Sequence, residues 1–118
     1  MLQVLLVDDN ALQLGVRQAV LQQAGFTVST AMTADDALAY LRTPELAARF
    51  GVVVTDHILP GDSGAVFVRQ LREHSRIPVI VVTGLPEAEE EYATLNVTFL
   101  HKPLPPEELI ERVKGFLS

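Results

Sequence analysis

Five polar residues that suit phosphate and metal chemistry follow short apolar runs in this 118-residue chain. Asp8 and Asp9 follow the first run, Asp56 follows the third, Thr83 ends the fourth, and Lys102 follows the fifth. Carboxylates that lie close together repel one another, and bound Mg²⁺ relieves that repulsion while leaving coordination positions for phosphate oxygens. A lysine ammonium attracts a phosphate, and a threonine hydroxyl can donate a hydrogen bond to one. With a metal present, one of these aspartates could attack a phosphoryl donor and become an aspartyl phosphate.

Each of these residues also has an ordinary explanation when it is taken alone. The Asp8-Asp9 pair could cap the following helix, since aspartate is common at that position. Asp56 could be a loop carboxylate, Lys102 a surface lysine and Thr83 a strand residue. Their joint occurrence at the ends of four apolar runs favours a common site.

The apolar runs predict five strands. Three runs, at residues 4–7, 52–54 and 79–82, are continuous and rich in valine, isoleucine and leucine. Two weaker runs, at residues 26–28 and 97–100, contain threonine. Continuous runs of this length are typical of strands buried on both faces of a parallel sheet. We therefore expect the three pure runs in the middle of the sheet and the other two at its edges.

Segments with a period of 3.6 residues separate the runs and predict helices. Asn10 and Thr33 are expected N-caps, Gly25 is expected to end the first helix, and the stretch from Pro86 to Tyr92 predicts a brief helix. The expected buried faces are Leu12, Val16, Ala19 and Val20; Ala34, Ala37, Leu38 and Leu41; Gly64, Phe67, Val68 and Leu71; and Leu109, Ile110, Val113, Phe116 and Leu117. Five strand–helix units with short loops predict an α/β, doubly wound parallel sheet in a single domain over residues 1–118.

Composition narrows the function classes. Fifteen acidic against nine basic residues give a formal net charge of −6, which argues against nucleic-acid or membrane-surface binding. No apolar stretch reaches the roughly 18–20 residues of a membrane span, and no signal peptide is evident, so we expect a cytoplasmic domain. The absence of cysteine excludes disulfides and thiolate chemistry. The histidines at 57, 74 and 101 lack metal-ligand spacing, and His57 is interpreted as a neutral neighbour of Asp56.

Ligands of open parallel sheets bind at the carboxyl ends of the strands, so the polar residues should meet at one edge. The order of these motifs along the chain resembles that in the receiver domain of two-component response regulators. The motifs are Asp8-Asp9, Asp56 followed by Pro60-Gly61, Thr83, and Lys102-Pro103. The resemblance covers essentially the whole chain. It implies a flavodoxin-like sheet in the order 2-1-3-4-5, with helices on both faces.

The resemblance also implies roles for individual residues. Asp56 would be the phosphoacceptor, and Asp8, Asp9 and Asp56, with the backbone carbonyl of Ile58, would hold Mg²⁺. The domain would be a phosphoryl-accepting signalling switch and not an enzyme in its own right. A histidine kinase or histidine phosphotransfer protein would donate the phosphoryl group, and an unidentified downstream protein would read the result.

The remaining roles belong to the fourth and fifth strands. Thr83 would be the switch hydroxyl, Lys102 would pair with the phosphoryl group and precede a cis bond to Pro103, and Phe99 would be the switch aromatic. Only 19 positions separate Thr83 from Lys102, and Leu95-Asn96 replaces a Gly-Ala pair. These departures favour a monomer or weak dimer, and residues 97–103 look more like receivers of hybrid histidine kinases.

Other functions on a similar sheet remain as alternatives. A Mg²⁺-dependent phosphohydrolase of the haloacid-dehalogenase type would need a second aspartate two residues after the nucleophile. Asp56 is followed by His57 and Ile58, so that pattern is missing. An interaction module without phosphate turnover would be favoured by loss of Asp56, Lys102 or the acid pair, and none is lost. Flavin binding would need a Ser/Thr/Gly-rich loop after the first strand, and the sequence lacks such a loop there.

Overall fold

Five parallel strands form the centre of the computed structural model, which describes residues 2–61 and 63–117. The strands are β1 (Gln3–Val7), β2 (Val28–Ala31), β3 (Phe50–Asp56), β4 (Val79–Thr83) and β5 (Thr98–His101). They pair in the order β2-β1-β3-β4-β5, and every pairing is parallel. The predicted sheet and its strand order are therefore confirmed.

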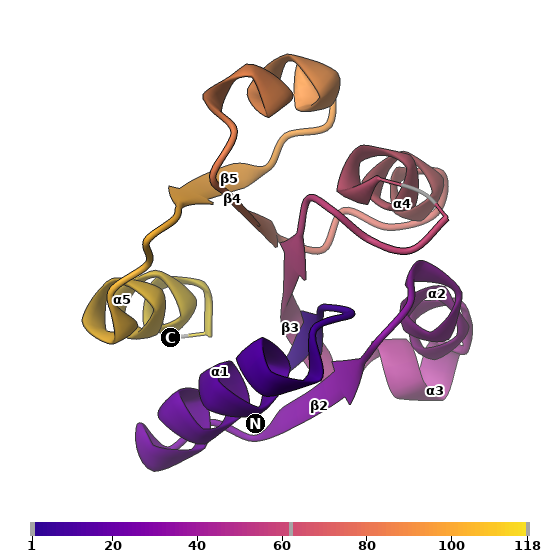
Figure 1. Ribbon diagram of the computed structural model, residues 1–118. Helices are drawn as coiled ribbons and strands as arrows, with labels where there is room; N and C mark the ends of the chain where they lie inside the picture. Colours follow the sequence, from indigo (N-terminus) through magenta and orange to yellow (C-terminus); the bar gives the residue numbers. More distant parts are fainter. Residues whose placement is uncertain (1, 62, 118) are drawn as a thin grey trace.

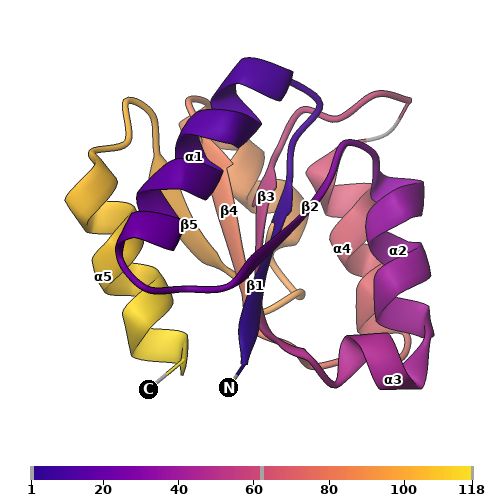
Figure 2. The same ribbon diagram turned by 90° about the horizontal axis from the view of Figure 1, so that it is seen from below.

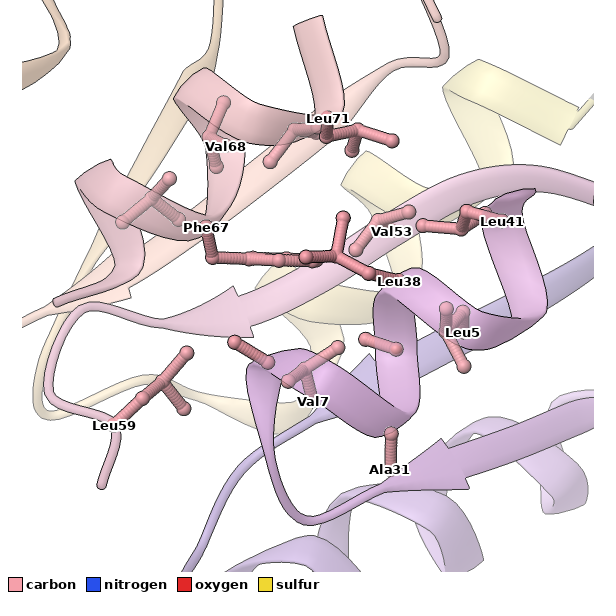
Figure 3. Close-up of a cluster of buried hydrophobic side chains, with 14 of the residues drawn as sticks. Leu5, Val7, Ala31, Leu38, Leu41, Val53, Leu59, Phe67, Val68 and Leu71 are labelled. Carbon is pink, nitrogen blue, oxygen red and sulfur yellow. The ribbon is translucent and has the colours of Figure 1, made fainter. Parts of the chain in front are cut away.

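The helices are α1 (Ala11–Gln23), α2 (Ala34–Arg42), α3 (Pro44–Ala47), α4 (Gly64–Arg72) and α5 (Pro106–Leu117), with a 3₁₀ helix, η1 (Pro86–Tyr92), between β4 and β5. They cover both faces of the sheet. Figures 1 and 2 show α1 and α5 on one face and α2, α3 and α4 on the other. The face built on α2 and α4 buries the residues drawn in Figure 3, with the ring of Phe67 at its centre.

The predicted division into central and edge strands is confirmed. All residues of β3 and β4 are buried, and β2 and β5 are at the edges and only partly buried. The second strand begins at Val28, two residues later than predicted, and Phe26 and Thr27 form an irregular link between Gly25 and the strand. Gly25 has φ +98°, a left-handed conformation that suits glycine and ends α1 as expected.

The predicted faces of α2 and α4 are confirmed, since every residue named for them is buried. In α5, Leu109 and Val113 are buried and the other three apolar residues are partly buried. Side chains of Asn10 and Thr33 cap α1 and α2, as predicted. The helix α3 was not predicted; it is a single turn that begins at Pro44.

The predicted buried face of α1 is wrong. Leu14 and Leu21 are buried, whereas Leu12 is 79% exposed and Val16 is 56% exposed. Apolar residues occur on several sides of this helix, so its periodicity does not single out one face. The rotation of α1 is instead matched to polar side chains on its first two turns, which contact carboxylates at the edge of the sheet.

Candidate functional site

Asp8 and Asp56 lie side by side at the carboxyl edge of the sheet. Leu6 of β1 and Val54 of β3 are register partners, and each aspartate is two residues further along its strand direction. Side chains two residues apart point to the same face, so both carboxylates are on the side of α1 and α5, where Leu6 and Val54 pack. Asp8 is 1% exposed and Asp56 is 5% exposed. The sequence-based expectation that these two carboxylates meet is correct.

Two side chains of α1 contact this carboxylate pair. Gln13 Nε2 donates to Asp8 Oδ2 at 2.5 Å and to Asp56 Oδ2 at 3.1 Å. Arg17 Nη1 donates to the same oxygen of Asp8 at 3.2 Å and forms a salt bridge with it. Burial lowers the pKa of Arg17, while the charges of Asp8 and Asp56 oppose that shift. Neither Gln13 nor Arg17 is predicted as a site residue from the sequence, because no motif marks them.

Lys102 provides a cation that contacts Asp56 directly. Its Nζ lies 2.9 Å from Asp56 Oδ2, and its side chain is 36% exposed. The Lys102 backbone N–H donates to the carbonyl of Thr83, which ties the β5 end to the β4 end. The expected cis peptide bond between Lys102 and Pro103 is present. Lys102 therefore contacts Asp56 from the position that the strand-end pattern predicted.

Thr83 and Phe99 lie on the other face of the sheet. Val81 and Phe99 are register partners in the core built against α2 and α4, and Thr83 follows Val81 by two residues. Thr83 is buried, and its Oγ1 accepts a hydrogen bond from the Leu85 N–H at 3.0 Å. Phe99 is half-buried, and its ring makes an edge contact with Tyr92, with centroids 5.4 Å apart.

His57 has closer contacts than the interpretation as a neutral neighbour implied. Its Nδ1 lies 2.7 Å from the buried hydroxyl of Tyr92, and its Nε2 lies 3.3 Å from Oε2 of Glu91. Burial raises the pKa of Tyr92, and the charges of Glu91 and Asp56 add to that shift. The Tyr92 hydroxyl also approaches Gly64, where an added Cβ would lie 2.6 Å from it. No sequence motif signals this contact, because it joins the β3 end to a short 3₁₀ helix.

The donor set around Asp56 fits a magnesium ion. Mg²⁺ in proteins is commonly held by one or two carboxylates and several waters, and Asp8 and Asp56 provide two adjacent carboxylates. No group of three Asp, Glu or His side chains suited to a metal occurs in residues 2–61 and 63–117. Asp9 is exposed and does not complete such a group. The backbone N–H of Ile58 points to Asp56 Oδ1 at 3.5 Å, so this loop borders the pair.

An apolar groove of about 460 Å³ lies next to the carboxylates, between α1 and the start of α5. Leu12 and Val16 line one side, and Pro103 and Leu104 line the other. Lys102 also lines this groove, so the groove is adjacent to the cation that contacts Asp56.

Within the described part of the chain, no helix has the length and apolar character needed to span a bilayer.

Known proteins are similar to this chain in both sequence and fold. The response regulator receiver domain model matches residues 4–114. The transcriptional regulatory protein AruR of Pseudomonas aeruginosa is 32% identical over 118 residues, a match that covers 97% of this chain and 48% of AruR. The C4-dicarboxylate transport transcriptional regulatory protein DctD of the same species is 36% identical over 120 residues, covering 98% of this chain and 25% of DctD.

The chemotaxis response regulator CheY4 of Vibrio cholerae gives a TM-score of 0.86 at 32% identity, and the match covers 99% of each chain. A response regulator receiver protein of Pseudomonas putida gives 0.86 at 32% identity, covering 97% of this chain and 96% of that one. The chain spans about half the length of AruR and a smaller part of DctD. Since the family model covers nearly all of it, the chain belongs to the response regulator receiver domain family, the signalling domains of two-component systems.

Proposed function

We propose that this domain is a phosphoryl-accepting switch in which Asp56 is the phosphoacceptor. The observation that carries the proposal is the buried Asp56 carboxylate, which contacts the Lys102 ammonium and lies beside Asp8. Buried carboxylates need paired charge, and the Lys102 cation can pair with a phosphoryl group as well as with the carboxylate.

In the proposed reaction, a carboxylate oxygen of Asp56 attacks the phosphorus of the donor. The new bond is carboxylate oxygen to phosphorus, and the bond from phosphorus to the donor's leaving group breaks, so the leaving group departs with the electron pair. Lys102 Nζ, within reach of Asp56 Oδ2, pairs with the negative charge on the transferred oxygens. When bound, Mg²⁺ would supply further charge neutralisation at the phosphoryl oxygens, held by Asp8, Asp9, Asp56 and the carbonyl of Ile58.

The proposed response to phosphorylation begins at Thr83. Its hydroxyl now accepts from Leu85 and can instead donate to a phosphoryl oxygen, which draws it toward Asp56. Phe99 is on the same face of the sheet and is the bulky side chain placed to follow. This coupling would shift a pre-existing equilibrium over η1, β5 and the start of α5, roughly residues 84–108, and alter a surface read by a downstream protein. Because η1 is a short, acidic 3₁₀ helix, we expect the activated domain to remain a monomer or a weak dimer.

The exposed apolar residues of α1 support a protein as the phosphoryl donor. Leu12 and Val16 are unusually exposed for large aliphatic side chains and line the groove next to Lys102. Contiguous exposed apolar surface of this kind is typical of protein interaction sites. We propose that a histidine kinase or histidine phosphotransfer protein docks here, that nucleic acid is not a ligand of this acidic domain, and that the domain acts in the cytoplasm.

The test is incubation with acetyl phosphate and MgCl₂, followed by intact-mass spectrometry. We expect one added phosphoryl group on the native domain, none on Asp56→Asn, and normal labelling of Asp36→Asn, which changes an exposed aspartate at the start of α2. Equal labelling of Asp56→Asn would refute the assignment. Continuous consumption of acetyl phosphate at many turnovers would instead favour the phosphohydrolase alternative.

A further inference from the structure

Arg17 and Gln13 of α1 contact the carboxylates that we propose to hold Mg²⁺. The Oδ2 atom of Asp8 accepts from both side chains, and Gln13 also reaches Asp56 Oδ2. The Arg17 side chain is only 11% exposed and that of Asp8 is 2% exposed, so water screens their pair weakly. The two carboxylates are therefore bridged by an amide and paired with a guanidinium from the protein itself.

The helix α1 presents these two groups in a fixed way. Positions 13 and 17 are four residues apart, which places them above one another on one face of a helix. The start of the helix is anchored because the Asn10 side chain accepts from the Gln13 N–H, and Asp8 Oδ1 accepts from the Asn10 N–H. The rotation that brings Gln13 and Arg17 to the carboxylates also leaves Leu12 and Val16 exposed.

Arg17 acts electrostatically as a competitor of a divalent cation. A guanidinium stays protonated in proteins, so Arg17 brings a positive charge to within 3.2 Å of an Asp8 carboxylate oxygen. A fixed positive charge at Asp8 repels an incoming cation, and the oxygen that accepts from Arg17 and Gln13 must exchange these donors for the metal. Charges interact more strongly here than at an exposed position, since the pair is largely buried.

We propose that Arg17 and Gln13 are positioning residues that hold Asp8 against Asp56 in the metal-free domain and thereby weaken Mg²⁺ binding. The inference rests on the proposed function, in that Asp8 and Asp56 must be the metal-binding pair. Its consequence is regulatory, because phosphoryl acceptance would then depend on the free Mg²⁺ concentration over a higher range than in a domain without this arginine.

The test is isothermal titration calorimetry with MgCl₂ at constant ionic strength. We expect Arg17→Met to bind Mg²⁺ about tenfold more tightly, equivalent to about 1.4 kcal/mol. Gln13→Leu, which removes a neutral donor, should bind about threefold more tightly. Arg17→Lys keeps the charge and should stay closer to the native affinity than Arg17→Met. The matched control is Arg42→Met, which removes an exposed arginine from the last turn of α2 and should leave the affinity unchanged.

Asp8→Asn separates this inference from the proposed function. We expect that variant to lose most Mg²⁺ affinity; if it binds as the native domain does, the metal site itself is wrong and both proposals fall. If Asp8→Asn loses binding but Arg17→Met and Gln13→Leu bind no more tightly than the native domain, only the competition is refuted. Should Arg17→Met fail to fold, as judged by circular dichroism, Gln13→Leu still decides the matter, because the competition requires it to bind Mg²⁺ more tightly than the native domain does.

Discussion

Replacing Tyr92 with phenylalanine is expected to destabilise the domain by about 1–3 kcal/mol, because it leaves a buried imidazole nitrogen without its partner. A carboxylate can only accept a hydrogen bond, so the contact of His57 Nε2 with Glu91 favours a proton on that nitrogen. In the neutral ring Nδ1 is then the acceptor, and the Tyr92 hydroxyl donates to it across 2.7 Å. Phenylalanine keeps the ring contacts with His57 and Phe99, so the loss comes from the hydroxyl alone.

The assay is urea unfolding followed by far-ultraviolet circular dichroism, with a thermal melt beside it. For a domain of this length, 1 kcal/mol corresponds to roughly 4 °C, so the melting temperature should fall by about 4–12 °C. The dependence of the unfolding free energy on urea should stay unchanged, since the change exposes no further surface.

Tyr40→Phe is the matched control, because Tyr40 is half-buried and makes an edge contact with Phe50. We expect that variant to stay within about 0.5 kcal/mol of the native domain. The double variant His57→Leu/Tyr92→Phe should lose less than the sum of its single changes, because both polar partners are removed together. A Tyr92→Phe variant as stable as the native domain, or additive losses in the double variant, would refute the reasoning.

Three further predictions follow from other contacts. Burial raises the pKa of Tyr92 above its ordinary value of 10.0, so the unfolded chain releases that proton first and stability falls as the pH rises above about 10. In urea unfolding, the stability advantage of the native domain over Tyr92→Phe should therefore be smaller at about pH 11 than at about pH 8. A larger advantage at the higher pH would contradict this. Arg72 donates to four backbone carbonyls, those of Ser75, Ile77, Leu95 and Asn96, and lysine cannot reproduce this planar set of donors. Arg72→Lys should therefore lower the free energy of unfolding by about 2 kcal/mol, whereas Arg69→Lys, at an exposed position of the same helix, should change it little. Equal losses of stability in the two variants would argue against the role of these bonds. Beryllofluoride, which mimics a phosphoryl group, should shift backbone NMR signals mainly over residues 84–108 and leave the faces built on Leu38 and Leu71 in place; large shifts confined to α2 and α4, or a tight dimer, would contradict the proposed switch.

Most of the fold could be predicted because the sequence is periodic where packing is simple. The central strands are buried on both faces and are therefore continuous apolar runs. Helix α4 has one apolar stripe and one polar side, so its buried face could be identified. Helix α1 has apolar residues around much of its circumference, and its orientation depends on Gln13 and Arg17 reaching carboxylates that come from two different strands.

The candidate site could be predicted only in part, for a similar reason. Asp8, Asp56 and Lys102 are strand-end residues, and strand order alone brings them together. Asp9 is one position further along and is exposed, and no group of three carboxylates forms within the described residues, so its part in holding Mg²⁺ stays a prediction. The contact of His57 with Tyr92 spans 35 residues and depends on how η1 packs, which no local pattern encodes.

Mapping the modified residue tests the central claim most directly. After reaction with acetyl phosphate and MgCl₂, borohydride reduces an aspartyl phosphate to homoserine, and tryptic peptides can be sequenced by tandem mass spectrometry. Cleavage after Arg17, Arg49 and Arg69 places Asp8 and Asp9 in one peptide, and Asp56 and Asp62 in another. We expect homoserine at position 56 alone. Homoserine at position 8, 9 or 62, with position 56 unmodified, would contradict the assignment of Asp56 as the phosphoacceptor.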